Sequence, residues 1–382
     1  MSTVLLAFAT SLVLTLVVIR YAKTRGSVLH DTDLSGPQKF HVGPVARVGG
    51  VGIVCGLLVA AIGFWLTLHV GSDDSWMALA ILACGAPAFA AGLVEDITKR
   101  VRPRTRLLFT AVSALLAAWL LDAVLRRTAI PGLDWIVAMP AGALVVTVFA
   151  VVGVANSVNI IDGFNGLASM CVMLMLTALA YVGFQSGDVL MGTLALAGIG
   201  AVMGFFIWNY PAGLIFLGDG GAYFLGFFVA ELSVLLLVRN PLTVSPLFPI
   251  LVCIYPVFET VFSIYRRRFL RAQPTSMPDG IHLHSLIYRR VLRWAVGDRS
   301  AKALTRRNSM TSPYLWMLCM LSVFPAMMFY GSTAILALFI VIFAVTYVAL
   351  YWRIVRFRSP RWLRLLWESK RREPLAADND GL

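Results

Sequence analysis

The sequence predicts an all-α protein that crosses a membrane many times. Hydrophobic residues make up 59% of its 382 residues, charged residues make up 13%, and the mean hydropathy is +0.82. Soluble domains are far less apolar. The apolar residues gather in runs of about 20, the length at which a helix spans the hydrocarbon core of a bilayer. Because a helix satisfies its backbone hydrogen bonds internally, each run is expected to be helical.

Eleven such runs follow one another along the chain, separated by hydrophilic connections. No stretch between them has the length and mixed composition of a soluble domain. We therefore expect one membrane domain over residues 1–352 and a basic tail over residues 353–382. In chain order, the predicted spans cover residues 3–20, 48–69, 76–94, 106–121, 136–155, 167–184, 188–207, 221–238, 245–264, 313–330 and 333–352.

Lys and Arg predict the orientation of the spans, because they remain preferentially in cytoplasmic loops. Of the 32 in the chain, 29 lie in segments that the alternating spans place on one side of the membrane. The amino terminus is therefore predicted outside and the carboxyl terminus in the cytoplasm. Because no basic residue precedes the first span, we expect it to remain as an anchor. The basic segments are 20–47, 95–106, 265–312 and the tail from Arg353, and the three exceptions are Arg126, Arg127 and Arg239.

Charge and cysteine content argue against two other classes of protein. The net charge of +13 is dispersed at the ends of apolar runs, which is typical of membrane topology and of contact with anionic headgroups. We therefore expect no nucleic-acid partner. Each of the five cysteines lies inside an apolar span without a CxxC pair, so neither disulfides nor a zinc site are expected.

Two predicted cytoplasmic loops, 156–166 and 208–220, contain no Lys or Arg and carry Asp and Asn among glycines. In NSVNIIDGFNG the polar residues recur every three positions, so a helix end or a tight turn would point them in one direction. Such a row could hold a nucleoside, a phosphate-bound metal ion, or both. Its last member could instead cap the helix that begins near Gly166. The row consists of Asn156, Asn159, Asp162 and Asn165.

The second loop ends in IFLGDGGAYFLG, in which glycines flank Asp219. Glycines allow a phosphate or an ion to approach the backbone closely. This pattern favours a binding role for Asp219. The residue could also cap the helix that follows, and the two roles can coexist.

Glu95 and Asp96 are hard to explain as structural residues. They close a span and so sit at a helix carboxyl end, where the macrodipole disfavours anions. Something must therefore compensate their charge. Lys99 and Arg100 could do so as a solvated ion-pair cluster, and a bound metal or substrate cation is the alternative. Two adjacent acids at this interface also suit proton abstraction from a phosphate.

Two further clusters suit an anionic ligand. His282 and His284 lie two residues apart on a predicted loop, and a lone HxH is a weak metal signal. Near several arginines such as Arg266, these imidazoles suit a phosphate or a pyrophosphate. Lys39 and His41 belong to a second cluster of mixed charge, for which an ordinary solvated loop is the alternative.

Five segments of this chain resemble the bacterial polyprenyl-phosphate N-acetylhexosamine-1-phosphate transferases, a family that includes WecA-like initiators of surface glycans and MraY-like phospho-N-acetylmuramoyl-pentapeptide transferases. The segments occur in the family's order and on the predicted cytoplasmic face, which makes the match specific. They are HVGPVARVGG (41–50), GLVED (92–96), NSVNIIDGFNGLA (156–168), NYPAGLIFLGDGG (209–221) and DGIHLHSLIYRR (279–290).

The resemblance implies transfer of a sugar-1-phosphate from a UDP-sugar to undecaprenyl phosphate, with release of UMP, in the bacterial inner membrane. It implies a requirement for Mg2+, with Mn2+ as an alternative ion, and is compatible with a homodimer. By the family's pattern, the metal site would comprise Asp219 and Asn159; the substrate-binding set would comprise Lys39, His41, Asn156, Asp162, Asn165, His282 and His284; and the catalytic set would comprise Asp96, Glu95 and Asp162.

Five positions depart from the family's pattern. Glu95 replaces the first Asp of an acidic pair, Ser285 replaces a third His, and Asn165 replaces the last acid of its row. In the loop near residue 33, Ser35 stands where a proline is expected and Gln38 where an Arg is common. These departures favour a UDP-N-acetylhexosamine donor such as UDP-GlcNAc. The phospho-N-acetylmuramoyl-pentapeptide transferase of peptidoglycan synthesis remains the alternative within the family.

Two readings outside the enzyme class also remain. A secondary transporter has a similar number of spans, but transporters place coupling charges near the bilayer midplane. Glu231 is the only clear midspan acid in the predicted spans, whereas the other polar residues gather at one interface. This distribution favours an enzyme. A noncatalytic assembly subunit on the same scaffold is the second of these readings. A catalytic assay separates the enzyme, the transporter and the subunit.

Overall fold

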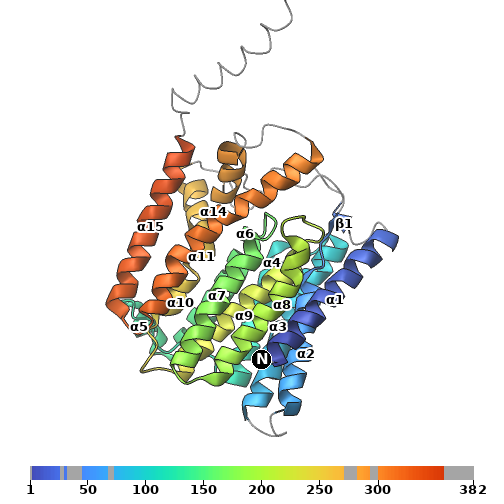
Figure 1. Cartoon of the computed structure of the whole chain (residues 1–382). Helices are drawn as coiled ribbons and strands as arrows, with labels where there is room; N and C mark the ends of the chain where they lie inside the picture. Colours follow the sequence, from blue (N-terminus) through green and yellow to red (C-terminus); the bar gives the residue numbers. More distant parts are fainter. Residues whose placement is uncertain are drawn as a thin grey trace, which may run out of the picture.

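The computed structural model describes residues 2–25, 30–31, 45–67, 73–270, 282–292 and 300–356. Within these ranges the protein is a helical bundle with one two-stranded ribbon (Figure 1). The predicted all-α class is therefore confirmed. The elements are α1 (Ser2–Arg25), β1 (His30–Asp31), β2 (Val45–Ala46), α2 (Gly50–Thr67), α3 (Asp73–Thr98), α4 (Pro103–Leu121), α5 (Leu133–Val137), α6 (Pro140–Ile161), α7 (Leu167–Gln185), α8 (Val189–Asn209), α9 (Gly218–Arg239), α10 (Leu247–Val252), α11 (Ile254–Tyr265), η1 (Arg266–Leu270), α12 (Leu283–Leu286), η2 (Ile287–Val291), α14 (Ala301–Met328) and α15 (Thr333–Val355).

Nine helices in the described part of the chain are long and apolar enough to cross a membrane, namely α1, α3, α4, α6, α7, α8, α9, α14 and α15. The chain is therefore a multi-pass membrane protein. Helix α2 is a shorter apolar helix. The count of eleven crossings and the orientation of the termini stay predictions.

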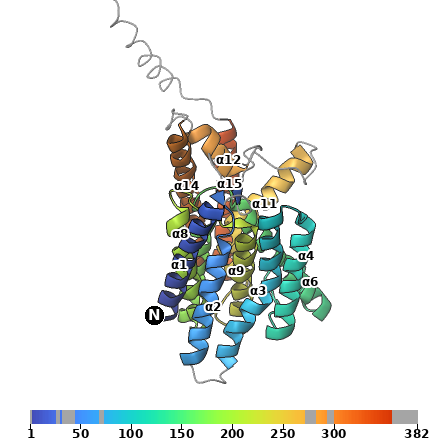
Figure 2. The ribbon, with the colours of Figure 1, turned by 90° about the vertical axis from the view of Figure 1, so that its right-hand side faces the viewer.

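The span predicted over 245–264 is broken at Cys253 into α10 and α11. Pro256 supplies the physical reason. Proline has no N–H, and its ring clashes with the carbonyl four residues earlier, here that of Val252, where α10 ends. In Figure 2 the end of α11 and the η1 that follows it point away from the bundle, and Phe269 of η1 is 71% exposed.

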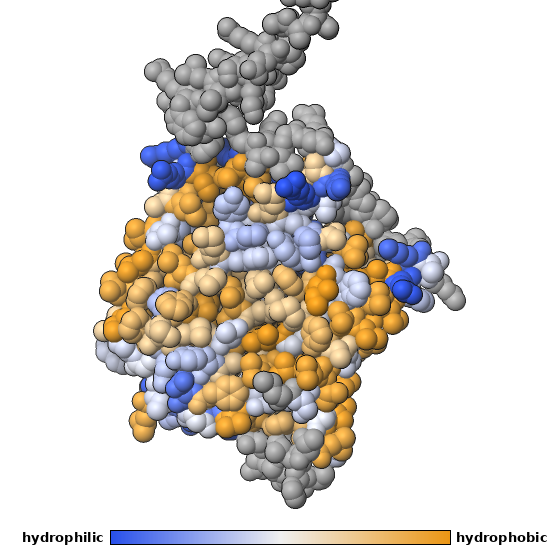
Figure 3. Space-filling view, viewed as in Figure 1, coloured by the Kyte–Doolittle hydropathy of each residue, from blue (hydrophilic) through white to orange (hydrophobic). Residues whose placement is uncertain are grey.

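The surface of the bundle has the polarity expected of a membrane protein. Apolar residues cover most of its middle, and strongly hydrophilic residues gather near its two ends (Figure 3). Trp119 on α4 and Phe149 on α6 are each 79% exposed. Large apolar side chains at such exposure are stable when they face lipid.

Helix α9 forms the centre of the bundle. Its residues from Gly218 to Leu237 are buried, and it packs against α3 and α6. Its last turn is fixed by Arg239, whose Nε lies 2.7 Å from Asp188 Oδ2. Its first turn lies at the opposite end of the bundle, which is the upper end in Figure 1. A ligand that binds this first turn is therefore held by a helix that is buried over nearly its whole length.

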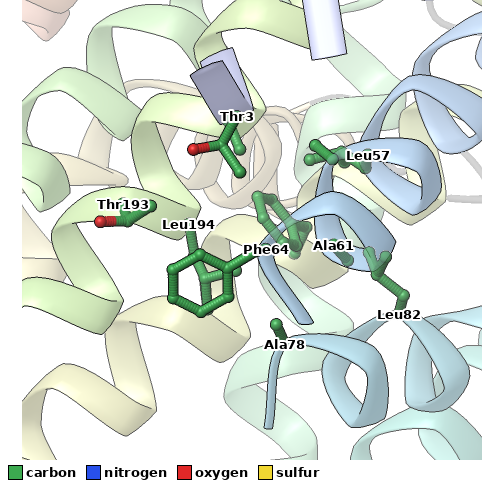
Figure 4. Close-up of a pocket in the computed structure, with 11 residues that line it drawn as sticks. Thr3, Leu57, Ala61, Phe64, Ala78, Leu82, Thr193 and Leu194 are labelled. Carbon is green, nitrogen blue, oxygen red and sulfur yellow. The ribbon is translucent and has the colours of Figure 1, made fainter. Parts of the chain in front are cut away.

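A small apolar pocket lies between α1, α2, α3 and α8, at the end of the bundle where α1 begins (Figure 4). Its walls include Leu57, Phe64 and Leu82, and its polar lining residues are Thr3 and Thr193. No charged or imidazole side chain lines it. It therefore does not offer the acids, amides and histidines to which the sequence points.

Candidate active site

The chain arranges a tight crossing just before α9. Residues 46–50 pair with residues 215–217, and the Gly49 N–H donates to the Phe216 carbonyl at 3.0 Å. Gly218 follows with a φ of +79°, and a Cβ there would lie 1.9 Å from the Arg47 carbonyl oxygen. Only glycine fits this position. The crossing places Arg47 beside Asp219, the second residue of α9.

Asp96 caps the start of α9. Its Oδ1 accepts the N–H of Asp219 and its Oδ2 accepts the N–H of Gly220, each at 2.9 Å. The first N–H groups of a helix lack partners within the helix, and a carboxylate there also interacts favourably with the dipole. Asp96 is 2% exposed. The predicted position at a helix carboxyl end is confirmed, because Asp96 lies in the last turns of α3, although the helix continues to Thr98, beyond the predicted end of the span at residue 94.

Lys99, which the sequence suggests as a compensating cation, interacts favourably with the Asp96 carboxylate, but further groups also compensate its charge. Its direct partners are the amides of α9, and the Nε of Arg47 lies 4.0 Å from its Oδ1. The glycines after Asp219 also serve another purpose. A Cβ on Gly220 would lie 2.9 Å from the nitrogen of Leu93 in α3, and a Cβ on Gly221 would lie 2.8 Å from the Cα of Gly50 in α2. In the described structure, these glycines admit the neighbouring backbone of the chain itself.

Glu95 makes different contacts from its neighbour Asp96. Its Oε2 accepts the N–H of Val101 at 2.6 Å, and its carbonyl accepts the N–H of Lys99 at 2.8 Å. Lys99 has a φ of +56°. Glu95 therefore stabilises the turn that joins α3 to α4.

Two guanidinium groups flank the Asp219 carboxylate. Arg47 Nη2 lies 3.5 Å from Asp219 Oδ1, and Arg106 forms an ion pair with Oδ2. The Arg106 group also lies 5.7 Å above the ring of Tyr223. Arg106 is a site residue that the motifs do not reveal. A signal exists, because Arg106 is the first residue of the predicted span 106–121 and Asp96 closely follows the preceding span 76–94, so both lie at the same membrane interface.

Asn156 and Asn159 share one face of α6. The Asn159 amide donates to Asp219 Oδ1 at 3.0 Å, and the Asn156 side-chain oxygen accepts the Tyr223 hydroxyl at 3.2 Å. Tyr223 is one turn along α9 from Asp219. The spacing of three residues thus predicts their common direction correctly. Their location in a loop is corrected, since α6 extends to Ile161.

Asp162 follows α6 directly, and its N–H donates to the Asn159 carbonyl at 3.2 Å. Burial raises the pKa of this carboxyl from 3.8 to about 7, and the charge of Arg47 opposes that rise. Arg47 therefore faces three acids, namely Asp96, Asp162 and Asp219. It connects the acid of α3 with the acids that follow α6 and open α9.

Asn165 departs from the rest of its row. It is 4% exposed, and its side-chain amide donates to the Pro211 carbonyl and to Ser309 Oγ, each at 3.2 Å. Its side chain does not cap α7, which begins after Gly166 without a side-chain cap. These contacts fasten α14 to the loop. A substrate-binding role for Asn165 stays a prediction.

The two histidines meet a residue that the motifs do not reveal. His282 Nδ1 lies 3.2 Å from Glu259 Oε1, and both rings are buried and stack with centroids 5.0 Å apart. His284 also contacts Phe164 edge to face, with ring centroids 5.5 Å apart. The histidines therefore adjoin the loop after α6. Glu259 lies within the predicted span 245–264 and is 1% exposed, so Glu231 is not the only acid within the predicted spans.

The remaining predicted substrate residues, Lys39 and His41, lie outside the described residues. Their roles stay predictions.

The donor atoms around Asp219 can be compared with the needs of Mg2+. Among the described residues there is no cluster of three or more His, Cys, Asp or Glu suited to hold a metal. The Asp219 carboxylate and the side-chain oxygen of Asn159 are the hard donors that Mg2+ prefers. In this structure the Asn159 amide nitrogen faces Asp219, and Arg47 and Arg106 pair with the carboxylate, so the ion would take the place of these contacts. Mg2+ takes one or two protein carboxylates and completes its shell with phosphates and water. The residues present fit this ion when it arrives with a phosphate.

Comparison with known proteins gives a consistent result. The sequence model of glycosyl transferase family 4 matches residues 78–237, the range from α3 to α9. The chain is 28% identical to a probable undecaprenyl-phosphate N-acetylglucosaminyl 1-phosphate transferase of Bacillus subtilis, over 74% of this chain and 76% of that protein.

Two further relatives extend the comparison. An undecaprenyl-phosphate alpha-N-acetylglucosaminyl 1-phosphate transferase of Thermotoga maritima is 30% identical over 69% of this chain and 74% of its own. A phospho-N-acetylmuramoyl-pentapeptide-transferase of Geobacillus kaustophilus is 29% identical over 49% of this chain and 60% of its own. The extent of the match to the Thermotoga protein, together with the family match, shows that this chain belongs to glycosyl transferase family 4.

Proposed function

We propose that this protein transfers N-acetylhexosamine-1-phosphate from a UDP-sugar to undecaprenyl phosphate and so initiates a lipid-linked cell-surface glycan. An oxygen of the lipid phosphate forms a bond to the β-phosphorus of the donor. The bond from that phosphorus to the bridging oxygen breaks, and UMP leaves. The observation that carries this proposal is the convergence of Asp219, Arg47, Arg106 and Asn159 at one end of an apolar bundle.

The arrangement suits phosphoryl transfer. This chemistry depends on alignment of the two reactants and on neutralisation of phosphate charge. Arg47 and Arg106 supply two guanidinium groups, which bind phosphate oxygens in bidentate geometry. Both are partly accessible, with side chains 28% and 13% exposed. They can therefore exchange part of their contact with Asp219 for contact with a substrate phosphate.

Asp219 and Asn159 are the residues that would hold Mg2+, with Mn2+ as an alternative ion. When bound, the ion neutralises charge on the transferring phosphate and on its leaving group. Asp96 fixes the position of Asp219 by binding the first amides of α9. Glu95 fixes the turn that leads to Arg106. Direct action of Asp96 or Glu95 on the lipid phosphate remains the sequence-based alternative.

The other residues bind the donor. We assign Asp162 and Asn156 to the nucleotide and His282 with His284 to a phosphate. Asn165 holds the loop on which Asp162 lies. The Bacillus and Thermotoga relatives, which each match most of this chain, are named for N-acetylglucosaminyl transfer, which favours UDP-GlcNAc as donor over the muramoyl-pentapeptide donor.

The location of the site matches an acceptor that is part lipid. The apolar middle of the bundle gives the polyprenyl tail a place in the membrane, and the polar end receives its phosphate. By the distribution of Lys and Arg, this end faces the cytoplasm of a bacterial cell, where nucleotide sugars are made.

The test is a transfer assay on the purified protein. The protein is incubated with undecaprenyl phosphate, Mg2+ and, separately, UDP-GlcNAc, UDP-GalNAc or UDP-N-acetylmuramoyl-pentapeptide, and UMP and lipid-linked sugar diphosphate are measured. We expect both products with an N-acetylhexosamine donor. Absence of lipid product with every donor would contradict the proposal.

Asp219→Asn serves as the internal control of this assay. Loss of the carboxylate should lower turnover by about 100-fold or more, because it removes an electrostatic contact to the reacting phosphate. The apparent melting temperature should change little, since Asn keeps the shape of the side chain. Normal turnover in this variant would remove Asp219 from the reaction.

A further inference from the structure

We propose that Glu259, an acid inside the membrane bundle, positions His282 and His284 to receive a substrate phosphate. This inference rests on the proposed function, in which the histidines bind phosphate. Glu259 belongs to α11 and the histidines belong to or adjoin α12, so the contact joins two elements that are separated in sequence.

A single carboxylate oxygen organises the pair. Glu259 Oε1 lies 3.2 Å from His282 Nδ1 and 3.9 Å from His284 Nδ1, and it accepts the N–H of Leu283 at 2.8 Å. An acceptor at Nδ1 selects the tautomer in which that nitrogen carries the proton. The ring of His282 is thereby held with Nε2 directed away from Glu259.

The Nε2 side faces the candidate site. A Cβ placed on Gly163 would lie 3.6 Å from His284 Nε2, so this atom adjoins the residue after Asp162. The two imidazole planes differ by only 12°. Because the rings are nearly parallel and both have Nδ1 toward Glu259, they present the same edge toward the turn at 162–164.

The surroundings of Glu259 are otherwise phenolic. Tyr255 of the same helix and Tyr347 of α15 interact with it electrostatically. The guanidinium of Arg266 donates a hydrogen bond to the Tyr351 hydroxyl at 2.6 Å. An acid in a membrane helix is costly unless it has partners, and such acids are retained where they have a function.

A purely structural role is the competing explanation, because the bond to the Leu283 N–H also anchors α12 to α11. Two variants separate the explanations. Glu259→Leu removes the acceptor, whereas Glu259→Gln keeps the size of the side chain and an acceptor oxygen. Glu231→Leu is the matched control, since Glu231 is also 1% exposed and its carboxylate oxygens have no hydrogen-bond partner among the described residues.

Steady-state kinetics give the first readout. Glu259→Leu should lower kcat/KM for the UDP-sugar by about 10- to 100-fold, as loss of a carboxylate that orients a functional histidine does. Because the histidines hold phosphate before and during transfer, most of this change should appear in KM. Glu259→Gln should recover most of the loss, and Glu231→Leu should match the wild type. A Gln variant as impaired as the Leu variant would overturn the acceptor role.

A double-mutant cycle gives the second readout. If Glu259 acts through the histidines, then Glu259→Leu should cause no further loss in a protein that already carries His282→Ala and His284→Ala. A structural role predicts that the losses add. Thermal melting of each variant shows whether it remains folded.

Nitrogen NMR of histidine-labelled protein gives a readout without catalysis. The His282 ring, assigned by comparison with His282→Ala, should show a protonated Nδ1 in the wild type and in Glu231→Leu, and should lose this signature in Glu259→Leu. An unchanged His282 ring signal would overturn the inference. If the wild type itself is inactive, the proposed function fails, and the NMR result still decides whether Glu259 positions the imidazole.

Discussion

Arg47 is the residue on which the acids of the candidate site converge. It faces Asp96, Asp162 and Asp219, which come from three different parts of the chain. Several acids near one point repel one another unless a cation lies between them. The Arg47 guanidinium, together with Arg106 beside Asp219, therefore allows the site to keep three carboxylates close together.

Asp162 provides a prediction about pH. Its folded-state pKa of about 7 lies above its ordinary value of 3.8, so the folded protein holds a proton that the unfolded chain releases. The resulting stability is fully present below pH 3.8 and is lost as the pH rises to about 7. The amide of Asp162→Asn does not titrate, so this variant does not lose that stability. The melting temperature of Asp162→Asn minus that of the wild type should therefore increase between about pH 4 and pH 7 and then level off.

This measurement is made without metal ion or nucleotide, and Asp122→Asn is the control. Asp122 is exposed and pairs with Arg126, four residues later in the chain and away from the candidate site. A melting difference between Asp162→Asn and the wild type that does not change with pH would contradict the raised pKa.

At the scale of elements, the first turn of α9 is the most consequential local structure. Asp96 satisfies two of its orphan amides, and Gly92 allows α3 to approach closely enough for that contact. The cap, the crossing helices and the metal-binding acid are therefore parts of one arrangement. A substitution that disturbs any one of them should therefore displace the others.

Asp96→Asn tests the cap. The amide keeps one acceptor oxygen but loses the second bond and the charge, so the variant should lose about 1 kcal/mol of stability and also turnover. Differential scanning fluorimetry and the transfer assay measure the two effects. Loss of turnover with an unchanged melting temperature would instead assign Asp96 directly to the reaction.

Gly92→Ala tests the helix crossing. Its Cβ would lie 2.5 Å from backbone atoms of Gly220, so α3 and α9 must separate, which should cost about 1–3 kcal/mol. Turnover should fall because Asp96 moves away from α9. Gly153→Ala in α6 is the control, since no atom lies within 4 Å of its new Cβ. Equal melting temperatures for the two variants would contradict the close contact.

The sequence predicts some parts of this arrangement and not others, for physical reasons. Hydropathy locates the helices because the bilayer imposes a fixed length on each of them. The break at Cys253 was also predictable from Pro256. The cap of α9 by Asp96 was not, because it depends on how two helices cross. Hydropathy does not reveal Glu259, because a single acid hardly changes the mean hydropathy of an apolar segment.

The same distinction applies within the polar loop after α6. The spacing of Asn156 and Asn159 correctly predicts a common face, since helical periodicity is a local property. Asn165 continues the spacing, but the chain turns after Ile161 and directs it toward α14. The periodic pattern cannot show where a helix ends.

At the scale of the whole molecule, the orientation of the bundle is the property still to be measured. Single cysteines at Arg126 and Arg104, both exposed and at opposite ends of α4, provide the probes. In intact cells, a membrane-impermeant thiol reagent should label Arg126→Cys readily, and Arg104→Cys only after permeabilisation. Native cysteines give little background, since four of the five are buried. Labelling of Arg104→Cys in intact cells would place the candidate site outside.

Helix α9 is fastened near both ends, by Asp96 at its first turn and by Arg239 with Asp188 at its last. A helix that is held near both ends tilts as a unit, so a tilt at one end also moves the other end. Bilayers that are thicker or thinner than the apolar band of a protein impose such tilt. The acyl-chain length of the surrounding lipids should therefore tune the catalytic rate, because it sets the angle at which Asp219 meets Arg47.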